Sequence, residues 1–289
     1  MPHHIRAMIP LYAMERGRFG RSLENLHHTL NGFEKHLGRR ATVDDFDDRV
    51  INAWCAWQFA KGLDPETIRG RRTLMVGIWK WAADNGLVRR LPGKLPKIKV
   101  PDKPPQCWHL DELRKLLAAA SQLPGFMRRD FRVPRSAFAT AWLRADYATG
   151  FRFADLHELD ARCIAPDGTV LIVQQKTRQA IVGHLDDAAL ASLDAIRSPA
   201  RRRPFRDLMN RKNLQVLVRG LVRSAGLSGS TKWIRRTGAT WIEVHQPGAA
   251  MTYLGHSTPG LARKSYIDPR YLQQHKPRPP NLDLPDETG

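Results

Sequence analysis

Four cationic side chains stand in short stretches of the sequence that could hold an anion. Arg152 follows a Thr-Gly pair where one predicted helix ends and the next begins, and an arginine beside free backbone N–H groups can hold a phosphate. Lys176 lies in a polar loop between two predicted strands. Lys232 and Arg235 are three residues apart, so both project from one face of a helix. Two cations side by side repel each other unless an anion lies between them, so this spacing suggests a phosphate contact.

A fourth stretch adds a histidine and a tyrosine to these cations. Leu254-Gly255-His256 is followed by Tyr266, ten residues after the histidine. Taken singly, each of these residues is the ordinary content of a core or of a solvated surface. The order of the four stretches along the chain is therefore more informative than any one of them.

The net charge of the chain points to a polyanionic partner. The 289 residues contain 47 Lys and Arg against 28 Asp and Glu, a formal net charge of +19. Residues 1–106 carry a net charge of +8 and residues 107–289 a net charge of +11, so both halves are basic. Neutralising phosphates releases counterions and drives binding, which suits this excess better than an ordinary metabolic role does.

Several classes of protein are excluded by what the sequence lacks. It has no P-loop, no Gly-x-Gly-x-x-Gly and no His-Glu-x-x-His, the motifs of nucleotide, dinucleotide and zinc-protease chemistry. Cys55, Cys107 and Cys163 are odd in number and have no Cys-x-x-Cys pairing, which argues for a reducing compartment. No apolar run approaches the length of a membrane span and no secretory leader is evident, so we expect no membrane partner and a cytoplasmic location.

The first third of the chain predicts a bundle of helices. Apolar residues recur at three- and four-residue steps in residues 21–38, the pattern of an amphipathic helix. A second helix is expected from a start at Thr42 to Phe59, and a third begins at Asp64, before a proline, and ends near Gly86. Residues 91–106 then contain five prolines and four lysines without a helical period, which predicts an extended basic linker. This linker could be a plain domain spacer or a strap along phosphates, and the two are compatible.

The rest of the chain predicts a mostly helical domain with one small sheet. Three antiparallel strands joined by tight turns are expected in residues 161–185. Helices are expected over His109–Ala120, Arg135–Thr149, Asp186–Ile196, Asp207–Ala225 and Lys232–His245. The predicted fold class is mainly α, with an α+β second domain.

The first two basic stretches resemble motifs of the tyrosine recombinase, or phage integrase, family of DNA breaking-rejoining enzymes, whose relatives include type IB topoisomerases. Thr-Gly-Phe-Arg152 with Asp155 three residues later is similar to the first box of that family. Lys176 is similar to the lysine that the family carries in a β-turn. In the same order along the chain, the remaining two stretches resemble the other boxes.

The third and fourth stretches resemble the second box, the third box and the nucleophile of the same family. Lys232-Trp-Ile-Arg235 is similar to the second box, which usually reads His-x-x-Arg-His. Leu-Gly-His256 is similar to the third box, and Tyr266 to the nucleophile. The resemblance covers nearly the whole chain from about residue 18. It implies an N-terminal segment (1–17), a helical core-binding (SAM-like) DNA-binding domain (18–90), the linker (91–106), a catalytic domain (107–272) and a C-terminal tail (273–289).

The resemblance also implies a role for each candidate residue. The Tyr266 hydroxyl would attack a DNA phosphodiester, giving a 3′-phosphotyrosine and a free 5′-hydroxyl. Arg152 and Arg235 would clamp the non-bridging oxygens, and Lys176 would protonate the leaving 5′-oxygen. The phosphotyrosine bond conserves the energy of the cleaved ester, so no metal, nucleotide or other cofactor is expected.

Three further residues would assist. His256 would donate to a non-bridging oxygen or assist the proton transfer, and Lys232 would donate to a phosphate oxygen. Asp155 would orient the basic side chains. Lys232 stands where histidine is commonest in the family and Arg236 replaces the second histidine of that box. A lysine is a donor but a poor base near neutral pH.

The spacing of the third box leaves a choice of nucleophile. His256 and Tyr266 are ten residues apart, one more than is commonest in the family, so Tyr271 remains a second candidate. The function expected is that of a site-specific recombinase or integrase acting on double-stranded DNA, as a homotetramer on paired sites near the nucleoid. A type IB topoisomerase and a catalytically inactive DNA-binding protein of the same fold are the alternatives. The helical domain and the basic linker favour the recombinase.

Overall fold

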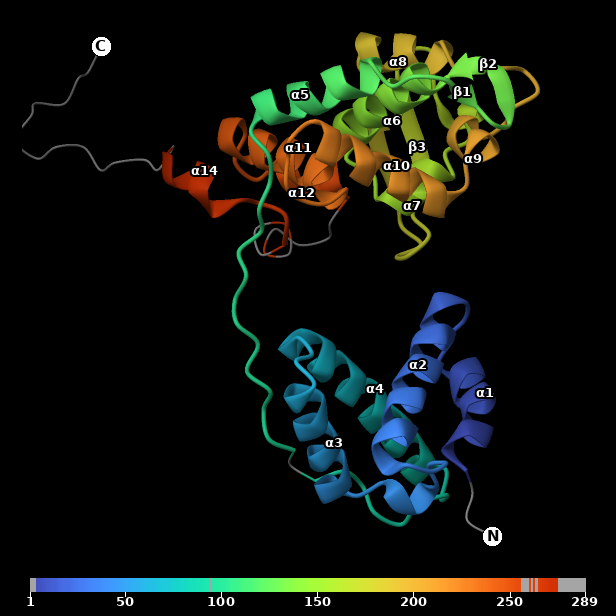
Figure 1. Cartoon of the computed structure of the whole chain (residues 1–289), viewed down its shortest axis with the longest axis vertical. Coiled ribbons are helices and arrows are strands. Elements are labelled where there is room, and N and C mark those ends of the chain that lie inside the picture. The colour runs from blue at the N-terminus through green and yellow to red at the C-terminus, as the bar shows by residue number, and fades with distance from the viewer. Residues whose placement is uncertain (1–3, 94, 256–259, 261, 263–264, 275–289) are drawn as a thin grey trace, which may run out of the picture. The chain divides into compact units, whose positions relative to one another are not determined.

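The computed structural model describes residues 4–93, 95–255, 260, 262 and 265–274, and most of them are helical (Figure 1). The chain divides into two compact units, Met1–Asp102 and Lys103–Gly289, and each unit has a hydrophobic core of its own. None of the described helices combines the length and the apolar character that crossing a membrane would need. The mainly α fold class predicted from the sequence is confirmed.

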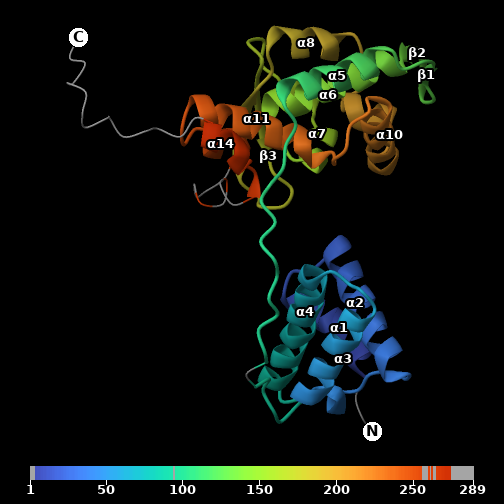
Figure 2. The same cartoon turned by 60° about the vertical axis from the view of Figure 1, so that its left-hand side comes forward.

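The first unit is a bundle of four helices around one core (Figure 2). It consists of α1 (Ile5–Glu15), α2 (Arg21–Leu37), a short 3-10 helix η1 (Val43–Asp45), α3 (Asp48–Ala60) and α4 (Pro65–Asp84). The start expected at Thr42 belongs to η1, where Thr42 and Asp45 form a capping box. Helix α3 begins at Asp48, three residues after the end of η1. Its N-cap is Asp47, whose carboxylate accepts a hydrogen bond from the N–H of Arg49.

Helix α1 extends the bundle to residues that the sequence pattern did not identify as helical. Ile5, Ile9 and Tyr12 are buried in the core of the first unit, and the ring of Tyr12 packs edge-on against Trp81 at 5.7 Å between centroids. Pro10 lies inside this helix and removes one backbone donor, which is why the sequence argues against a helix there.

Much of the proline-rich linker lies against the first unit. Residues 85–93 and 95–109 contain no helix or strand. The N–H of Gly93 donates to the Asp48 carboxylate at 3.0 Å, next to the ion pair of Arg90 with the same carboxylate. Ile98 packs partly buried on the core of the bundle. The segment is therefore fixed to the bundle over part of its length, more than a plain spacer would require.

The second unit is built around helix α6, with α5, α8 and α11 packed on it (Figures 1 and 2). Phe138, Trp142 and Ala145 of α6 are fully buried. Its helices are α5 (Leu110–Ser121), α6 (Arg135–Thr149), α7 (Phe153–His157), α8 (Asp187–Asp194), α9 (Pro204–Leu208), α10 (Arg211–Ser224), α11 (Lys232–His245), α12 (Ala250–Leu254) and α14 (Pro269–Gln274). Its strands are β1 (Phe126–Met127), β2 (Asp130–Pro134), β3 (Thr169–Val173) and β4 (Ala180–His184).

The described strands form two antiparallel hairpins rather than one three-stranded sheet. Strands β3 and β4 pair from Thr169–His184 to Val173–Ala180, as expected. The prediction of a third strand at the start of residues 161–185 is wrong, because residues 161–163 form a short 3-10 helix, η2 (Ala161–Cys163), capped by the Asp160 carboxylate. Only one bridge, between Ile164 and Val170, remains of it. The β1–β2 hairpin was not predicted.

One predicted helix is divided in two. The pattern over Asp207–Ala225 suggested a single helix, whereas α9 ends at Leu208 and α10 begins at Arg211. The Asn210 side chain accepts a hydrogen bond from the N–H of Asn213 at 2.9 Å. This cap satisfies a backbone donor that would otherwise lack a partner, so the helix starts afresh at that point.

Candidate active site

Arg152 is presented by a tight turn between α6 and α7. Gly150 ends α6 in the left-handed conformation, with φ of 57°, and its N–H donates to the carbonyl of Asp146 at 3.1 Å. Phe151 is fully buried and anchors the turn. Arg152 is the N-cap residue of α7, and its Nη1 donates to Oε1 of Gln174. The guanidinium is thereby held at the end of strand β3.

Asp155 fixes the turn that carries Lys176. The Asp155 carboxylate is only 5% exposed and accepts a hydrogen bond from the N–H of Gln175 at 2.9 Å. The Thr177 hydroxyl donates to Oε1 of Gln174 at 2.6 Å, which closes the same turn. Lys176 is exposed at the tip between β3 and β4. Asp155 thus acts on the position of the lysine through the backbone of the turn.

Arg235 is buried beside Tyr266. It lies in the first turn of α11, is 5% exposed, and donates from Nη2 to the carbonyl of Leu254 at 2.8 Å. Its guanidinium carbon lies 5.1 Å from the centroid of the Tyr266 ring, within the range of a cation–π contact. Within the described part of the chain, Nε and Nη1 have no hydrogen-bond partner. Buried donors of this kind normally require an acceptor, so they are available to a bound anion.

The charges around Arg235 place the two arginines in one electrostatic environment. Burial lowers the pKa of Arg235, Tyr266 acts in the opposite direction, and the charge on Arg152 adds to the lowering. A second cation close to a buried guanidinium is unfavourable unless an anion compensates for it. This site is therefore suited to a doubly contacted anion.

The end of α12 closes against the β3–β4 hairpin. Gly255 ends α12 in the left-handed conformation, with φ of 60°. A Cβ atom on Gly255 would lie 2.5 Å from Cγ2 of Ile181 and 3.2 Å from Nε2 of Gln174, so only glycine fits there. Gln174, which accepts from Arg152 of the first motif, therefore leaves no room for a side chain at Gly255 of the third motif.

The described tyrosines near these elements differ in their surroundings. Tyr266 is partly buried, and its carbonyl accepts from the Thr240 hydroxyl at 3.4 Å. Tyr271, the other candidate nucleophile, packs its ring 4.7 Å from that of His109, and burial raises its pKa. Tyr253 donates its hydroxyl to the carbonyl of Tyr147 at 2.6 Å, and burial raises its pKa as well. Of these three rings, Tyr266 is the one that contacts Arg235.

Neither Lys232 nor Arg236 takes part in the contact between Arg235 and Tyr266. Lys232 is exposed at the start of α11, in the same turn as Arg235. Arg236 points to the carbonyl of Gln106, at 3.4 Å. His256 lies outside the described residues. The structure thus joins Arg235 to Tyr266 by a ring contact, and the charge of Arg152 acts on Arg235. Lys176 and Lys232 are both exposed, Lys176 on the turn that Asp155 holds and Lys232 in the same turn of α11 as Arg235.

Sequence reasoning missed Gln174, which is fully buried. A signal for it was present in strand β3. Val170 and Ile172 face the core, and Gln174 continues the same two-residue period, so a polar side chain falls at a buried position. A buried amide at the end of a strand needs a polar partner, and Arg152 supplies it.

Asp146 is a second buried polar residue that the sequence did not reveal. It lies one turn before Gly150, is 2% exposed, and its Oδ2 has no hydrogen-bond partner among the described residues. Burial raises the pKa of Asp146 to about 8, and the charge on Arg235 opposes that shift. Its carboxyl group therefore contributes to the electrostatic surroundings of Arg235.

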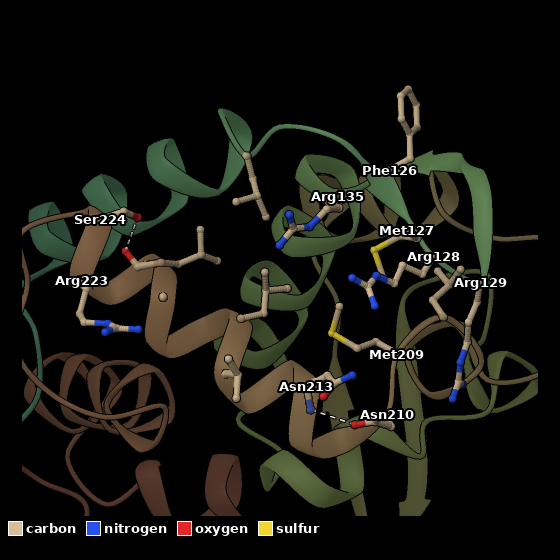
Figure 3. A pocket seen from close by; sticks show the side chains of 16 residues that line it. Phe126, Met127, Arg128, Arg129, Arg135, Met209, Asn210, Asn213, Arg223 and Ser224 are labelled. Atoms are coloured by element: carbon tan, nitrogen blue, oxygen red, sulfur yellow. Dashed lines mark hydrogen bonds between the residues drawn. The ribbon is translucent and has the colours of Figure 1, made fainter.

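A groove of about 730 Å³ in the second unit lies elsewhere, between α10 and the β1–β2 hairpin (Figure 3). None of the candidate residues lines it. In the described ranges, no group of three or more His, Cys, Asp or Glu side chains is placed to hold a metal ion. The contact of Arg235 with Tyr266 is thus separate from this groove.

No protein-family model matches the chain, and no curated protein matches it either. Solved structures do match. A lambda integrase dimer (residues 75–356) bound to a COC′ core site is 17% identical, with a TM-score of 0.72, covering 89% of this chain and 95% of that chain. The XerH site-specific recombinase bound to palindromic difH substrate is 14% identical, with a TM-score of 0.68, and the match covers 94% of this chain and 82% of that chain.

A third structure agrees with these two. The Tn1549 transposon integrase in complex with circular intermediate DNA is 13% identical, with a TM-score of 0.68, and the match covers 96% of this chain and 100% of that chain. At such low identity the likeness concerns the path of the backbone. The chain has the fold of the integrases and site-specific recombinases of the tyrosine recombinase family.

Proposed function

We propose that this chain is a site-specific DNA recombinase or integrase that cleaves and rejoins strands through a 3′-phosphotyrosine intermediate. The observation that carries the proposal is the contact of the buried Arg235 with Tyr266, with the charge of Arg152 close by. The fold and the net charge of +19 support it. A tyrosine ring in contact with a buried guanidinium, with the charge of a second arginine acting on that guanidinium, is suited to attack on a phosphodiester.

The two arginines would bind the non-bridging oxygens of the scissile phosphate. Arg235 is held by the Leu254 carbonyl and keeps Nε and Nη1 for the anion. Arg152 is oriented by Gln174. Donors that are fixed before the substrate arrives need little reorganisation as charge develops in the transition state.

The chemical step would then follow in line. The Tyr266 hydroxyl passes its proton to water, with His256 assisting the transfer, and its oxygen bonds to phosphorus while the bond from phosphorus to the 5′-oxygen breaks. Lys176 donates a proton to that leaving oxygen, and its exposed position on the β3–β4 turn leaves it free to approach DNA. Lys232 and His256 would donate to non-bridging oxygens, and Asp155 would keep the turn in place. Attack by the 5′-hydroxyl of another strand reverses the step and joins the strands.

The partner in this proposal is double-stranded DNA. Residues 18–90 would form the core-binding domain, residues 107–272 the catalytic domain, and the chain would act as a homotetramer on paired sites. Among the matched structures, one is a lambda integrase tetramer bound to a Holliday junction, at 17% identity and a TM-score of 0.69. Phosphate contacts from both basic halves of the chain would contribute most of the affinity.

The experiment that tests the proposal is capture of covalent protein–DNA complexes. Purified protein is incubated with genomic DNA of its host, denatured with detergent, and the DNA ends that remain attached are sequenced. A recombinase should give attached 3′ ends at one or a few sequences. A topoisomerase should give attached ends at many sequences and relax any supercoiled plasmid, and a binding protein without catalysis should give none.

Joint formation separates the first two of these outcomes directly. Two linear duplexes that carry the captured sequence are mixed with the protein, and recombinant products are measured. Products of exchanged length support the recombinase. Relaxation of plasmids without exchanged products contradicts it and supports the topoisomerase.

A further inference from the structure

A groove of about 730 Å³ lies between α10 and the β1–β2 hairpin, apart from every residue of the candidate active site (Figure 3). Its floor is apolar and includes Met127, Met209 and Leu217. Phe126, on its rim, is 56% exposed. Apolar surface exposed to water is unfavourable, so an exposed apolar groove with charged residues around it is typical of a contact surface.

One face of α10 borders this groove along the length of the helix. Asn213, Val216, Gly220 and Arg223 follow one another at steps of three and four residues, so they share a face. Val216 is 57% exposed, and a Cβ atom on Gly220 would meet nothing within 4 Å. This face of α10 is therefore not covered by the described part of the chain.

The charge of the groove has one sign. Arg128, Arg129, Arg135 and Arg223 line it, and no acidic residue does. Arg129 donates to backbone carbonyls, whereas the side chains of the other three make no hydrogen bond or ion pair with the residues that the structure describes. Elsewhere in the same unit arginines pair with carboxylates, as Arg206 does with Glu158. The three arginines of the rim thus favour an acidic occupant.

We propose that the groove binds an amphipathic α-helix of a partner protein, with an apolar stripe flanked by acidic residues and laid along α10. The stretch of α10 that lines the groove runs from Asn213 to Ser224, which corresponds to about 18 Å, or about three turns of a bound helix. Gly220 allows a second helix backbone to approach closely. The floor methionines adapt to different apolar side chains, as in other helix-binding grooves. Duplex DNA would match the arginines but offers no apolar stripe to cover the floor.

Designed peptides test this surface with the full chain. The probe is a labelled helical peptide of about four turns, with leucines at positions one, four, eight and eleven and glutamates elsewhere. A comparison peptide has the same leucines and carries lysines in place of the glutamates. Fluorescence anisotropy should show the glutamate peptide binding about tenfold or more tightly than the lysine peptide, because desolvated charges of like sign repel.

Gly220→Leu should abolish this binding by filling the groove. The change keeps the fold, since φ at Gly220 is helical and leucine is a better helix former than glycine. Gly70→Leu is the matched control, because Gly70 lies on α4 and is equally open. We expect a loss of about tenfold or more for Gly220→Leu and no change for Gly70→Leu. Arg128→Glu combined with Arg223→Glu should reverse the preference between the two peptides.

Three results would overturn the proposal. The first is equal binding of the two peptides, or binding that Gly220→Leu does not affect. The second is that the designed helix does not bind, while a peptide of residues 275–289 binds and loses its binding in Gly220→Leu. The groove would then accept the chain's own C-terminal segment. The third is a loss of duplex DNA affinity of about tenfold in Gly220→Leu without peptide binding, which would assign the groove to DNA.

Discussion

The guanidinium of Arg235 lies 5.1 Å from the centroid of the Tyr266 ring. Arg235 comes from the start of α11, whereas Tyr266 lies beyond α12, so the contact depends on how the C-terminal elements fold back on α11. The arginine is fixed from its other side by the carbonyl of Leu254. A cation held in this way positions the tyrosine and remains able to neutralise charge on a phosphate next to it.

Gln174→Leu should slow strand cleavage, because Arg152 then loses the acceptor that orients its guanidinium. A misplacement of about 1 Å at a reacting centre can cost about a hundredfold in rate, so we expect a loss of about tenfold to a hundredfold. The measurement is single-turnover cleavage of a duplex that carries the captured site. Gln175→Leu is the control, since Gln175 is the neighbouring exposed glutamine. Equal rates for the two variants would show that Gln174 only fills space.

Lys232→Ala should reduce the cleavage rate more than Lys232→His. Lys232 starts the turn of α11 that carries Arg235, from which an exposed ammonium can reach a phosphate oxygen. Removing a donor of this kind from a transition state costs about 2.7–4 kcal/mol, or roughly a hundred- to a thousandfold in rate. Histidine restores a donor, so part of the activity should return. DNA affinity should change little, because one charge among many contributes a small share.

A single-turnover cleavage rate of Lys232→Ala within a few-fold of the wild type would identify Lys232 as an ordinary surface lysine. Arg236→Ala serves as the comparison, since Arg236 is turned toward the carbonyl of Gln106. We expect the Arg236 change to leave the single-turnover rate close to that of the wild type.

Asp146→Asn should alter how stability depends on pH. Burial raises the pKa of Asp146 to about 8 from a value of 3.8 for the free side chain. The folded state therefore favours the protonated carboxyl group, and this contribution is complete below pH 4 and is lost as the pH rises toward 8. Relative to Asp146→Asn, the wild type should lose up to about 1.4 kcal/mol of unfolding free energy per pH unit in that range.

Urea unfolding at pH 5, 6.5 and 8 measures this difference, with the asparagine variant as the reference that cancels all other titrations. Parallel profiles would contradict the prediction. A variant that is less stable than the wild type at every pH would show instead that Asp146 is ionised and paired with Arg235.

The three cysteines should react differently with a maleimide. Cys163 is exposed, whereas Cys55 and Cys107 are buried, and burial raises the pKa of Cys107 to about 12. A thiol reacts as its thiolate, so only Cys163 should be modified in the folded chain. Mass spectrometry should show one label under native conditions and three in denaturant. Rapid native labelling of Cys107 would contradict its burial in the structure.

The sequence predicted the elements whose ends carry local signals. The bounds of α6 and α11 match the expected ranges, because Gly150 terminates one and the basic amphipathic pattern defines the other. Helix α1 was missed because Pro10 interrupts its pattern, and packing in the core overrides that cost. The strand expected near Ile164 failed because Asp160 caps a competing turn.

The order of the motifs along the chain was enough to select candidate site residues, but the contacts that hold their side chains could not be predicted from it. Arg235 and Tyr266 were selected by their sequence motifs, and the structure places them in contact, with the charge of Arg152 acting on Arg235. Gln174 and the carbonyl of Leu254 could not be selected in that way, because their roles arise only when β3, α11 and α12 meet. The catalytic roles of all the candidate residues stay predictions.

Covalent trapping on a nicked duplex tests the nucleophile. A nick next to the cleavage point lets the short 5′-hydroxyl fragment diffuse away, so a 3′-phosphotyrosine accumulates and survives detergent. Tyr266→Phe removes only the hydroxyl and leaves the ring that packs on Arg235 and the basic surfaces in place. The variant should therefore still shift the duplex in a native gel.

The account predicts that the wild type and Tyr271→Phe form the detergent-resistant adduct at similar yield, and that Tyr266→Phe binds the same duplex and forms none. An adduct from Tyr266→Phe, together with its loss in Tyr271→Phe, would contradict the assignment of Tyr266 as the nucleophile.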